Sequence, residues 1–115
     1  MIKIVEVKVI DLVGERATDT AQGDILYQRI LDAFSDKQQV LLDFAGMKTI
    51  LSVFLNNALG ALYKKYDSKF LNNNLKIKNM SPDDMFILKR VTERARAFFA
   101  NSQDITNVLD EAFIS

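Results

Sequence analysis

Residues 39–60, QVLLDFAGMKTILSVFLNNALG, constrain the fold of this chain more than any other segment. The segment starts with a short apolar run at residues 40–44, in which Asp43 is the only polar residue. A run of this length is typical of a central strand that is buried on both faces. A turn around Gly46 follows, and then an apolar helix that begins at Ser52. The segment therefore predicts a strand–turn–helix unit on which the rest of the chain packs.

The helix that begins at Ser52 has one apolar face and one polar face. Its apolar residues recur every three or four positions, which is the spacing of an amphipathic helix. Gly60 costs about 1 kcal/mol relative to alanine inside a helix, so we expect a close approach to the sheet there. The apolar face consists of Leu55, Ala58, Leu59, Leu62 and Tyr66, and the polar face of Asn56, Asn57, Lys64 and Lys65.

The N-terminal third predicts one strand and one helix. Apolar and charged residues nearly alternate over residues 2–10, which favours a strand with one buried face. The pattern breaks over residues 11–17, around Gly14. Residues 20–34 have helical spacing, and capping residues precede them or lie in their first turn, namely Thr18, Asp19 and Gln22.

The C-terminal part predicts a turn, a strand and two helices. Residues 72–74 are three asparagines, typical of a turn, and residues 75–78 form a short strand. Ser81 is predicted to cap a helix, with proline at its first position. Residues 101–104 are expected to end that helix, and residues 105–113 to form a short final helix. The buried face of the longer helix is predicted to hold Ile87, Leu88, Val91, Ala95, Phe98 and Phe99.

Strands that alternate with helices predict an α/β domain. We expect a small mixed sheet of about four strands with three to four helices, in a single domain that covers residues 1–115. A right-handed crossover is expected to place residues 75–78 parallel to residues 40–44.

The composition excludes several classes of function. The 15 basic and 15 acidic side chains cancel, so gross charge predicts neither a nucleic-acid nor a membrane partner. The chain has no cysteine and no histidine, which removes thiol nucleophiles, imidazole bases and nearly all zinc sites. It also lacks a phosphate-binding glycine loop. We therefore expect a non-enzymatic protein without a cofactor.

The location of the protein follows from its apolar segments. The N-terminal residues 1–10 alternate charged and aliphatic side chains, which differs from the unbroken apolar core of a signal peptide. No apolar run approaches the roughly 20 residues of a membrane helix. We expect a cytoplasmic protein.

The segment LLDFAGMKTILSVFLNNALGAL resembles the core of STAS domains, the family of sulfate transporters and anti-sigma-factor antagonists. Residues 42–46 match the strand and turn, Ile50 matches an aliphatic position, and Ser52 falls where the family has its phosphorylatable serine. A divergent STAS-like group without an assigned function is the more similar one, through the helix entry at residues 16–23 and the pairs at residues 43–44 and 54–55.

The resemblance implies a regulatory module of bacterial signal transduction. A related antagonist docks on an ATP-binding serine kinase of the histidine-kinase fold, and phosphorylation of the serine ends the docking. By resemblance, phosphorylation would fall on Ser52, and the partner-binding residues would be Lys48, Thr49, Leu51, Ser52 and Asn56. The chain departs from the family pattern at Leu51, because the family has an acidic residue before the serine.

The residues also allow simpler interpretations. Ser52 can be a plain helix cap that contributes about 1 kcal/mol, and Asp43 can bind the amides of its turn. The loss of the acidic neighbour at Leu51 favours a structural or homodimerisation module without a switch. Because Phe98 and Phe99 are adjacent, one of the two is expected to be exposed and available for such a dimer.

Basic side chains gather at two places. Lys64, Lys65, Lys69, Lys76 and Lys78 are interleaved with aromatic residues, a composition that can bind single-stranded nucleic acid but that is also normal at a helix end and a sheet edge. Lys89, Arg90, Arg94 and Arg96 are predicted to form a solvated helix face. Arg16 and Asp19 are interpreted as a solvated loop residue and a cap.

Overall fold

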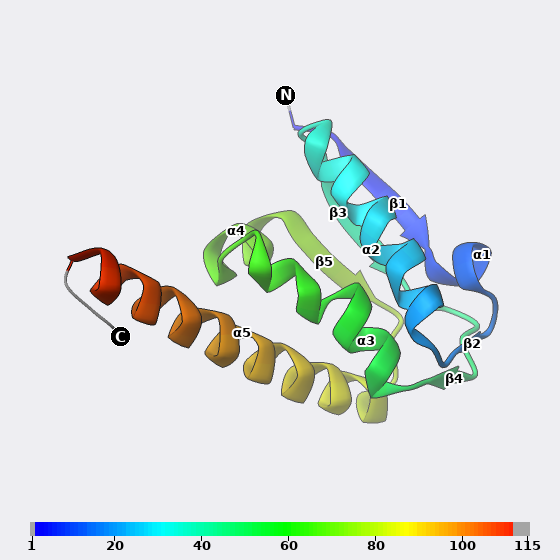
Figure 1. Cartoon of the computed structure of the whole chain (residues 1–115). Coiled ribbons are helices and arrows are strands. Elements are labelled where there is room, and N and C mark those ends of the chain that lie inside the picture. The colour runs from blue at the N-terminus through cyan, green and yellow to red at the C-terminus, as the bar shows by residue number, and fades with distance from the viewer. Residues whose placement is uncertain (1, 112–115) are drawn as a thin grey trace.

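The computed structural model describes the backbone of residues 2–111 and the side chains of residues 2–99. Its α-helices and strands are labelled in Figure 1. In chain order the elements are β1 (Ile4–Lys8), α1 (Val9–Val13), β2 (Arg16–Ala17), α2 (Thr20–Ser35), β3 (Gln39–Asp43), β4 (Thr49–Ile50), α3 (Ser52–Ala58), the 3₁₀ helix η1 (Gly60–Lys64), α4 (Ser68–Asn74), β5 (Leu75–Lys78) and α5 (Pro82–Glu111).

Three of the strands form one parallel sheet in the order β1-β3-β5. The predicted parallel pairing of residues 75–78 with residues 40–44 is confirmed, with Val40 opposite Leu75. A second parallel sheet joins β2 to β4. The predicted α/β class with a small sheet is thus confirmed, and every ladder among the described residues is parallel where a mixed sheet was expected.

The three-stranded sheet has one covered face and one open face. Val7 and Leu42 are opposite each other and buried on the covered face. On the other face Glu6, Leu41 and Lys76 form a row across the strands. Leu41 is half-buried, and Glu6 and Lys76 are exposed. The expectation that the central strand is buried on both faces is therefore wrong for one face. An ion pair between Lys78 and Glu6, 3.2 Å long, spans this open face.

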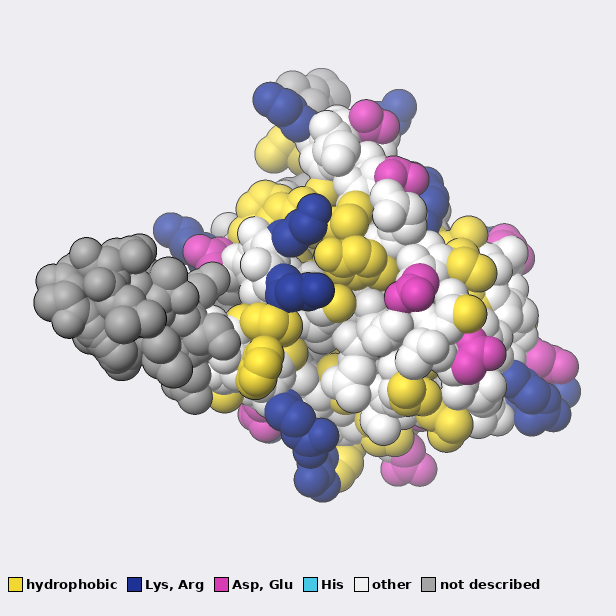
Figure 2. Space-filling model, viewed as in Figure 1, with side chains coloured by type: hydrophobic (Ala, Val, Ile, Leu, Met, Phe, Trp, Pro, Cys, Tyr) yellow, Lys and Arg dark blue, Asp and Glu magenta, His cyan; other side chains and the backbone are white. Residues whose placement is uncertain are grey.

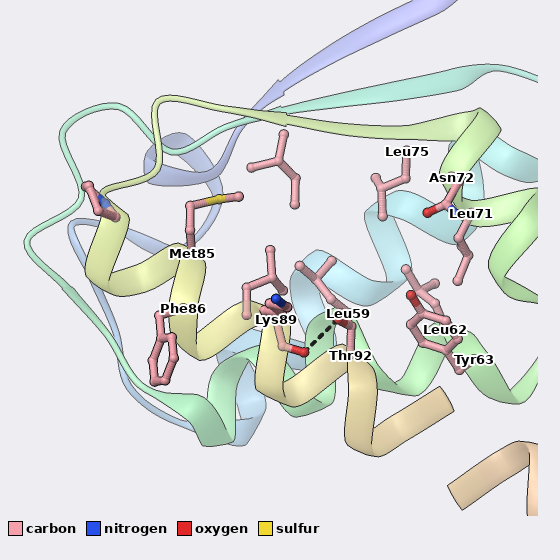
Figure 3. A pocket seen from close by; sticks show the side chains of 13 residues that line it. Leu59, Leu62, Tyr63, Leu71, Asn72, Leu75, Met85, Phe86, Lys89 and Thr92 are labelled. Atoms are coloured by element: carbon pink, nitrogen blue, oxygen red, sulfur yellow. Dashed lines mark hydrogen bonds between the residues drawn. The ribbon is translucent and has the colours of Figure 1, made fainter. Parts of the chain in front are cut away.

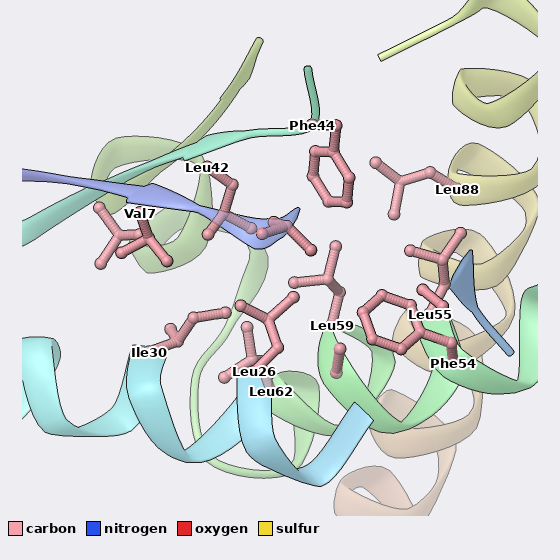
Figure 4. Packing of buried hydrophobic residues seen from close by; sticks show 14 of the residues in the cluster. Val7, Leu26, Ile30, Leu42, Phe44, Phe54, Leu55, Leu59, Leu62 and Leu88 are labelled. Atoms are coloured by element: carbon pink, nitrogen blue, oxygen red, sulfur yellow. The ribbon is translucent and has the colours of Figure 1, made fainter. Parts of the chain in front are cut away.

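The core lies between the covered face of the sheet and the helices α2, α3 and α5 (Figure 4). Helix α2 packs closely on α3 at Gly23, where an added Cβ would be 2.6 Å from Cβ of Asn57. Gly60, in contrast, faces α5, with Cγ1 of Val91 3.4 Å from an added Cβ. The expected approach of Gly60 to the sheet is thus wrong. The largest fully buried side chains are Phe54, Leu26, Ile30, Leu42, Leu55, Leu62, Val9 and Val40.

Two predicted helix starts are confirmed by their hydrogen bonds. At the start of α2, the amide of Gln22 donates to Oδ1 of Asp19 at 2.8 Å, and the amide of Asp19 donates to Oε1 of Gln22 at 3.1 Å. This reciprocal pair is a capping box. At the start of α5, the amide of Asp84 donates to Oγ of Ser81 at 3.2 Å.

Several element boundaries differ from the sequence prediction, and the helix predicted from Ser52 is divided into α3, which ends at Ala58, and η1. The strand predicted over residues 2–10 ends at Lys8, because the chain turns into α1 and places Val9 in the core. The turn predicted at residues 72–74 is wrong, since these asparagines complete α4. That helix begins at Ser68, and its N-cap residue is Asp67, whose Oδ1 accepts a hydrogen bond from the amide of Phe70 at 2.8 Å.

Helix α5 runs without a break from Pro82 to Glu111 and extends past α4 (Figure 1). The predicted interruption at residues 101–104 is therefore wrong, and residues 105–111 of the predicted final helix belong to α5. The last two residues of that predicted helix, 112–113, lie outside the described residues. Residues 101–104 contain neither glycine nor proline, the two residues that most strongly end a helix. Within residues 2–111 no helix has the length and apolar character needed to cross a membrane.

Candidate functional site

The two-stranded sheet positions the start of α3. β2 pairs with β4, and the amide of Leu51 donates to the carbonyl of Ala17 at 2.9 Å. Leu51 occupies the N-cap position, and no side chain makes a capping hydrogen bond there. Ser52 is the first helical residue, as predicted, and its side chain is exposed. The interpretation of Ser52 as a plain cap is thus wrong.

A cavity of about 380 Å³ lies between the start of α3 and the side of α5. We call its exposed border the Ser52 surface, defined as Leu51, Ser52, Phe86, Arg90 and Arg94. The remaining lining residues are Ile50, Ile87 and Val91.

The Ser52 surface combines apolar and basic side chains. Leu51 is 45 % exposed and Phe86 is 62 % exposed, which is high for large apolar residues. The guanidinium carbon of Arg90 is 5.9 Å from the centre of the Phe86 ring, a cation–π contact. Neither Arg90 nor Arg94 forms an ion pair with another side chain of residues 2–99. This surface therefore offers apolar contact together with positive charge that other described side chains do not neutralise.

The other predicted partner-binding residues occupy different places. Nζ of Lys48 is 3.1 Å from a carboxylate oxygen of Glu15, and Oγ1 of Thr49 accepts a hydrogen bond from Arg16 at 3.3 Å. Lys48 and Thr49 therefore belong to the β2–β4 side and do not line the cavity. Asn56 lies one turn further along α3 and lines a neighbouring cavity that also includes Arg94.

Helix α5 contributes side chains that the sequence analysis did not assign to this site. The sequence predicts a solvated face for Arg90 and Arg94 and no role for Phe86. These three residues recur at intervals of four, so they share one stripe of the helix. That spacing was visible in the sequence, but the proximity of the stripe to Ser52 depends on how α5 packs on α3.

The remaining candidates have structural roles. Oδ1 of Asp43 accepts hydrogen bonds from Nδ2 of Asn79 and from the amide of Ala45, both at 2.9 Å. The hydrogen bond from Asn79, then that from Ala45, and the charges of Lys78 and Lys8 hold the pKa of Asp43 below its usual value. The predicted role of Asp43 in its turn is confirmed.

The five lysines that were considered for nucleic acid do not form one patch. Lys64, Lys65 and Lys69 belong to η1 and the turn and helix after it. Lys76 and Lys78 lie on β5, where they contact the carbonyl of Asn72 and the carboxylate of Glu6. Their aromatic neighbours Tyr66 and Phe70 stack on each other, with ring centres 4.5 Å apart, and pack against Phe34.

A second cavity, of about 490 Å³, lies between β5 and α5 (Figure 3). It shares Phe86 with the Ser52 surface. Figure 2 shows hydrophobic side chains gathered near the centre of the face that carries these elements, with basic side chains among them. Within the described part of the chain, no group of three acidic residues is arranged to hold a metal ion.

Comparison with protein families identifies a match. The model of the STAS-like domain of unknown function (DUF4325) matches residues 22–85, more than half of the 115 residues. The match begins within α2, includes Ser52 and ends in the first turn of α5. Comparison with curated proteins gives no match, and comparison with solved structures gives none either.

Proposed function

Because the chain belongs to the family of STAS-like domains of unknown function, we propose that it is a non-enzymatic regulatory module that docks on a protein partner through the Ser52 surface. The observation that carries the proposal is the exposure of Leu51 and Phe86 beside two arginines without an ion pair in residues 2–99. Aromatic side chains and arginine are enriched in the central, energetically dominant parts of protein interfaces. A partner that fits this surface presents apolar and acidic side chains.

The partner class that we propose is an ATP-binding serine kinase of the histidine-kinase fold, which the resemblance to anti-sigma-factor antagonists favours. Carboxylates of the kinase would pair with Arg90 and Arg94, and its apolar side chains would cover Phe86. In this proposal the module regulates its partner by binding to it and catalyses no reaction of its own.

The same surface supports a proposal for the switch. The kinase transfers the γ-phosphoryl group of ATP to Oγ of Ser52, the hydroxyl proton leaves with a base of the kinase, and ADP is released. The new phosphate carries a charge of about −1.5 to −2 at neutral pH. Ser52 lines the same cavity as Arg90 and Arg94, so this phosphate would pair with the arginines and compete with the carboxylates of the partner.

Docking is tested by isothermal titration calorimetry. The protein is titrated into each kinase of a panel of such kinases in the presence of a non-hydrolysable ATP analogue. We expect one kinase to bind, Phe86→Asp to weaken its binding at least tenfold, and Ile4→Asp to leave it unchanged. Ile4 is a matched control because it is 63 % exposed and lies on the open sheet face. Binding to no kinase of the panel, or equal losses in both variants, would contradict the proposal.

The switch is tested by adding ATP to the protein and the kinase that binds it, and by locating phosphate with mass spectrometry. We expect phosphate on Ser52, weaker docking of Ser52→Asp, and normal docking of Ser52→Ala. If no phosphate is found on Ser52 and both variants dock equally, the proposed switch is excluded and the protein is a docking module without it.

A second candidate function is dimerisation through α5. Phe98 of α5 is 62 % exposed. Its ring meets that of the adjacent Phe99 edge to face, with centres 4.9 Å apart. Light scattering tests this candidate. A dimer that Phe98→Asp converts into a monomer supports it, and a monomer at high protein concentration excludes it.

A further inference from the structure

The cavity between β5 and α5 reaches into the core of the domain (Figure 3). The least exposed of its lining residues are Leu59 and Leu62, at 2 % and 0 %. Leu75 approaches from β5, and Met85 approaches from α5. At about 490 Å³, the volume falls within the range of about 300–1,000 Å³ that is typical of small-molecule sites.

The lining of this cavity is apolar over most of its extent. Water in such a space finds few hydrogen-bonding partners, so an apolar occupant is favoured over water. The polar residues among the described residues of the lining form a small set: Tyr63, Asn72, Lys89 and Thr92. A site of this kind binds the apolar part of a ligand through its lining and orients it through the polar set.

Among residues 2–99, Lys89 is the only charged residue that lines the cavity. Its side chain is exposed and forms no ion pair with another side chain of residues 2–99. Its ammonium group therefore lies where an apolar cavity opens to water. The hydroxyl of Thr92, one turn further along α5, donates to the carbonyl of Lys89 at 3.1 Å. A single positive charge at the rim of an apolar cavity complements a single negative charge at the end of an aliphatic chain.

We propose that this cavity binds an aliphatic carboxylate of medium chain length. The hydrocarbon chain lies over Leu75 and Met85, and the carboxylate pairs with Nζ of Lys89. This site borders the Ser52 surface at Phe86, but its occupancy does not depend on the proposed docking on a kinase.

The test uses the full chain and the sodium salts of hexanoate, octanoate, decanoate and dodecanoate below their micelle-forming concentrations. Calorimetry is expected to give one bound molecule per chain. Each added methylene is expected to increase the affinity about fourfold until the cavity is filled. Decanoate is expected to bind more tightly than 1-decanol. Lys89→Gln is expected to remove that difference while 1-decanol binds as before.

A blocking variant locates the site. Met85→Trp is expected to abolish decanoate binding because the indole enters the cavity, whereas Ile25→Trp is expected to leave it unchanged. The two positions are matched in exposure, at 46 % and 48 %, and Ile25 does not line the cavity. Methyl NMR of the unmodified protein gives an independent location, with shifts expected at Met85 and Leu75 and none at Ile25.

Three results would overturn the proposal. The first is an absence of saturable binding by every alkanoate to the folded protein. The second is decanoate binding that shifts no methyl group of the cavity. The third is equal affinity for decanoate and 1-decanol in both the unmodified protein and Lys89→Gln, which would exclude recognition of the carboxylate.

Discussion

Nδ2 of Asn79 donates a hydrogen bond to Oδ1 of Asp43 over 2.9 Å, and this contact ties the residue after β5 to the last residue of β3. Asn79 adopts a left-handed conformation, with φ of 62°, which asparagine tolerates better than most residues. Lys8 and Lys78 are the register neighbours of Asp43 on the two adjacent strands. The carboxylate of Asp43 thus links the carboxyl ends of β3 and β5, and Lys8 of β1 is its register neighbour on the other side.

This arrangement predicts a pH dependence of stability. The pKa of Asp43 is lowered in the folded protein, so its charge stabilises the fold above the unfolded pKa of about 3.9. That stabilisation is lost as the pH falls through the lower, folded pKa. Asp43→Asn is expected to unfold at lower urea concentration than the unmodified protein at pH 7, with a smaller difference at pH 3. A difference that stays constant between these pH values would show that charge is not its cause.

A second prediction concerns the contact between α2 and α3. In Gly23→Ala the added Cβ would be 2.6 Å from Cβ of Asn57 and 2.9 Å from the carbonyl oxygen of Phe54. Overpacking of this kind costs about 1–3 kcal/mol of the free energy of unfolding. Gly60→Ala is the control, because its added Cβ meets no atom closer than 3.4 Å. Urea unfolding is expected to show a loss for Gly23→Ala alone, and equal effects would contradict the close helix contact.

The core makes a third prediction. Phe54 is 0 % exposed and Phe98 is 62 % exposed. Phe54→Ala is expected to lower the free energy of unfolding by about 3–5 kcal/mol, because it leaves a cavity as well as removing buried apolar surface. Phe98→Ala is expected to change it by less than about 0.5 kcal/mol. Denaturant unfolding at one protein concentration compares the two, and a large loss for Phe98→Ala would show that its ring is covered in solution.

A fourth prediction separates the two helix starts at Asp67 and Ser52. Asp67→Ala removes a side-chain cap and is expected to cost about 1 kcal/mol. Ser52→Ala is expected to cost less than about 0.5 kcal/mol, because Leu51 occupies the N-cap position. Thermal unfolding measures both. A loss in Ser52→Ala as large as that in Asp67→Ala would restore the cap as the role of this hydroxyl.

The sequence predicted the parts of the fold in which local pattern and tertiary structure agree. The capping box at Asp19 and the cap at Ser81 were both recognised, because each places its capping side chain within three residues of the amide that it binds. The apolar run at residues 40–44 marked the centre of the sheet. The parallel pairing with residues 75–78 followed from the handedness of the crossover.

The remaining features depend on contacts between distant segments. β2 and β4 have two residues each, which is too short for a periodic pattern, and their pairing joins Arg16 to Thr49. Phe86 and Arg90 reach the Ser52 surface only because α5 packs beside α3. The open sheet face was missed because the apolar run around Leu41 does not reveal whether one face or both are covered.

The most direct test of docking through the Ser52 surface is an amide NMR footprint of the labelled protein on addition of the kinase that binds it. The account predicts the largest shift changes at Leu51, Ser52, Phe86, Arg90 and Arg94, with none at Ile4 on the open sheet face. Changes concentrated on β1 and β5, with those five residues unaffected, would contradict it.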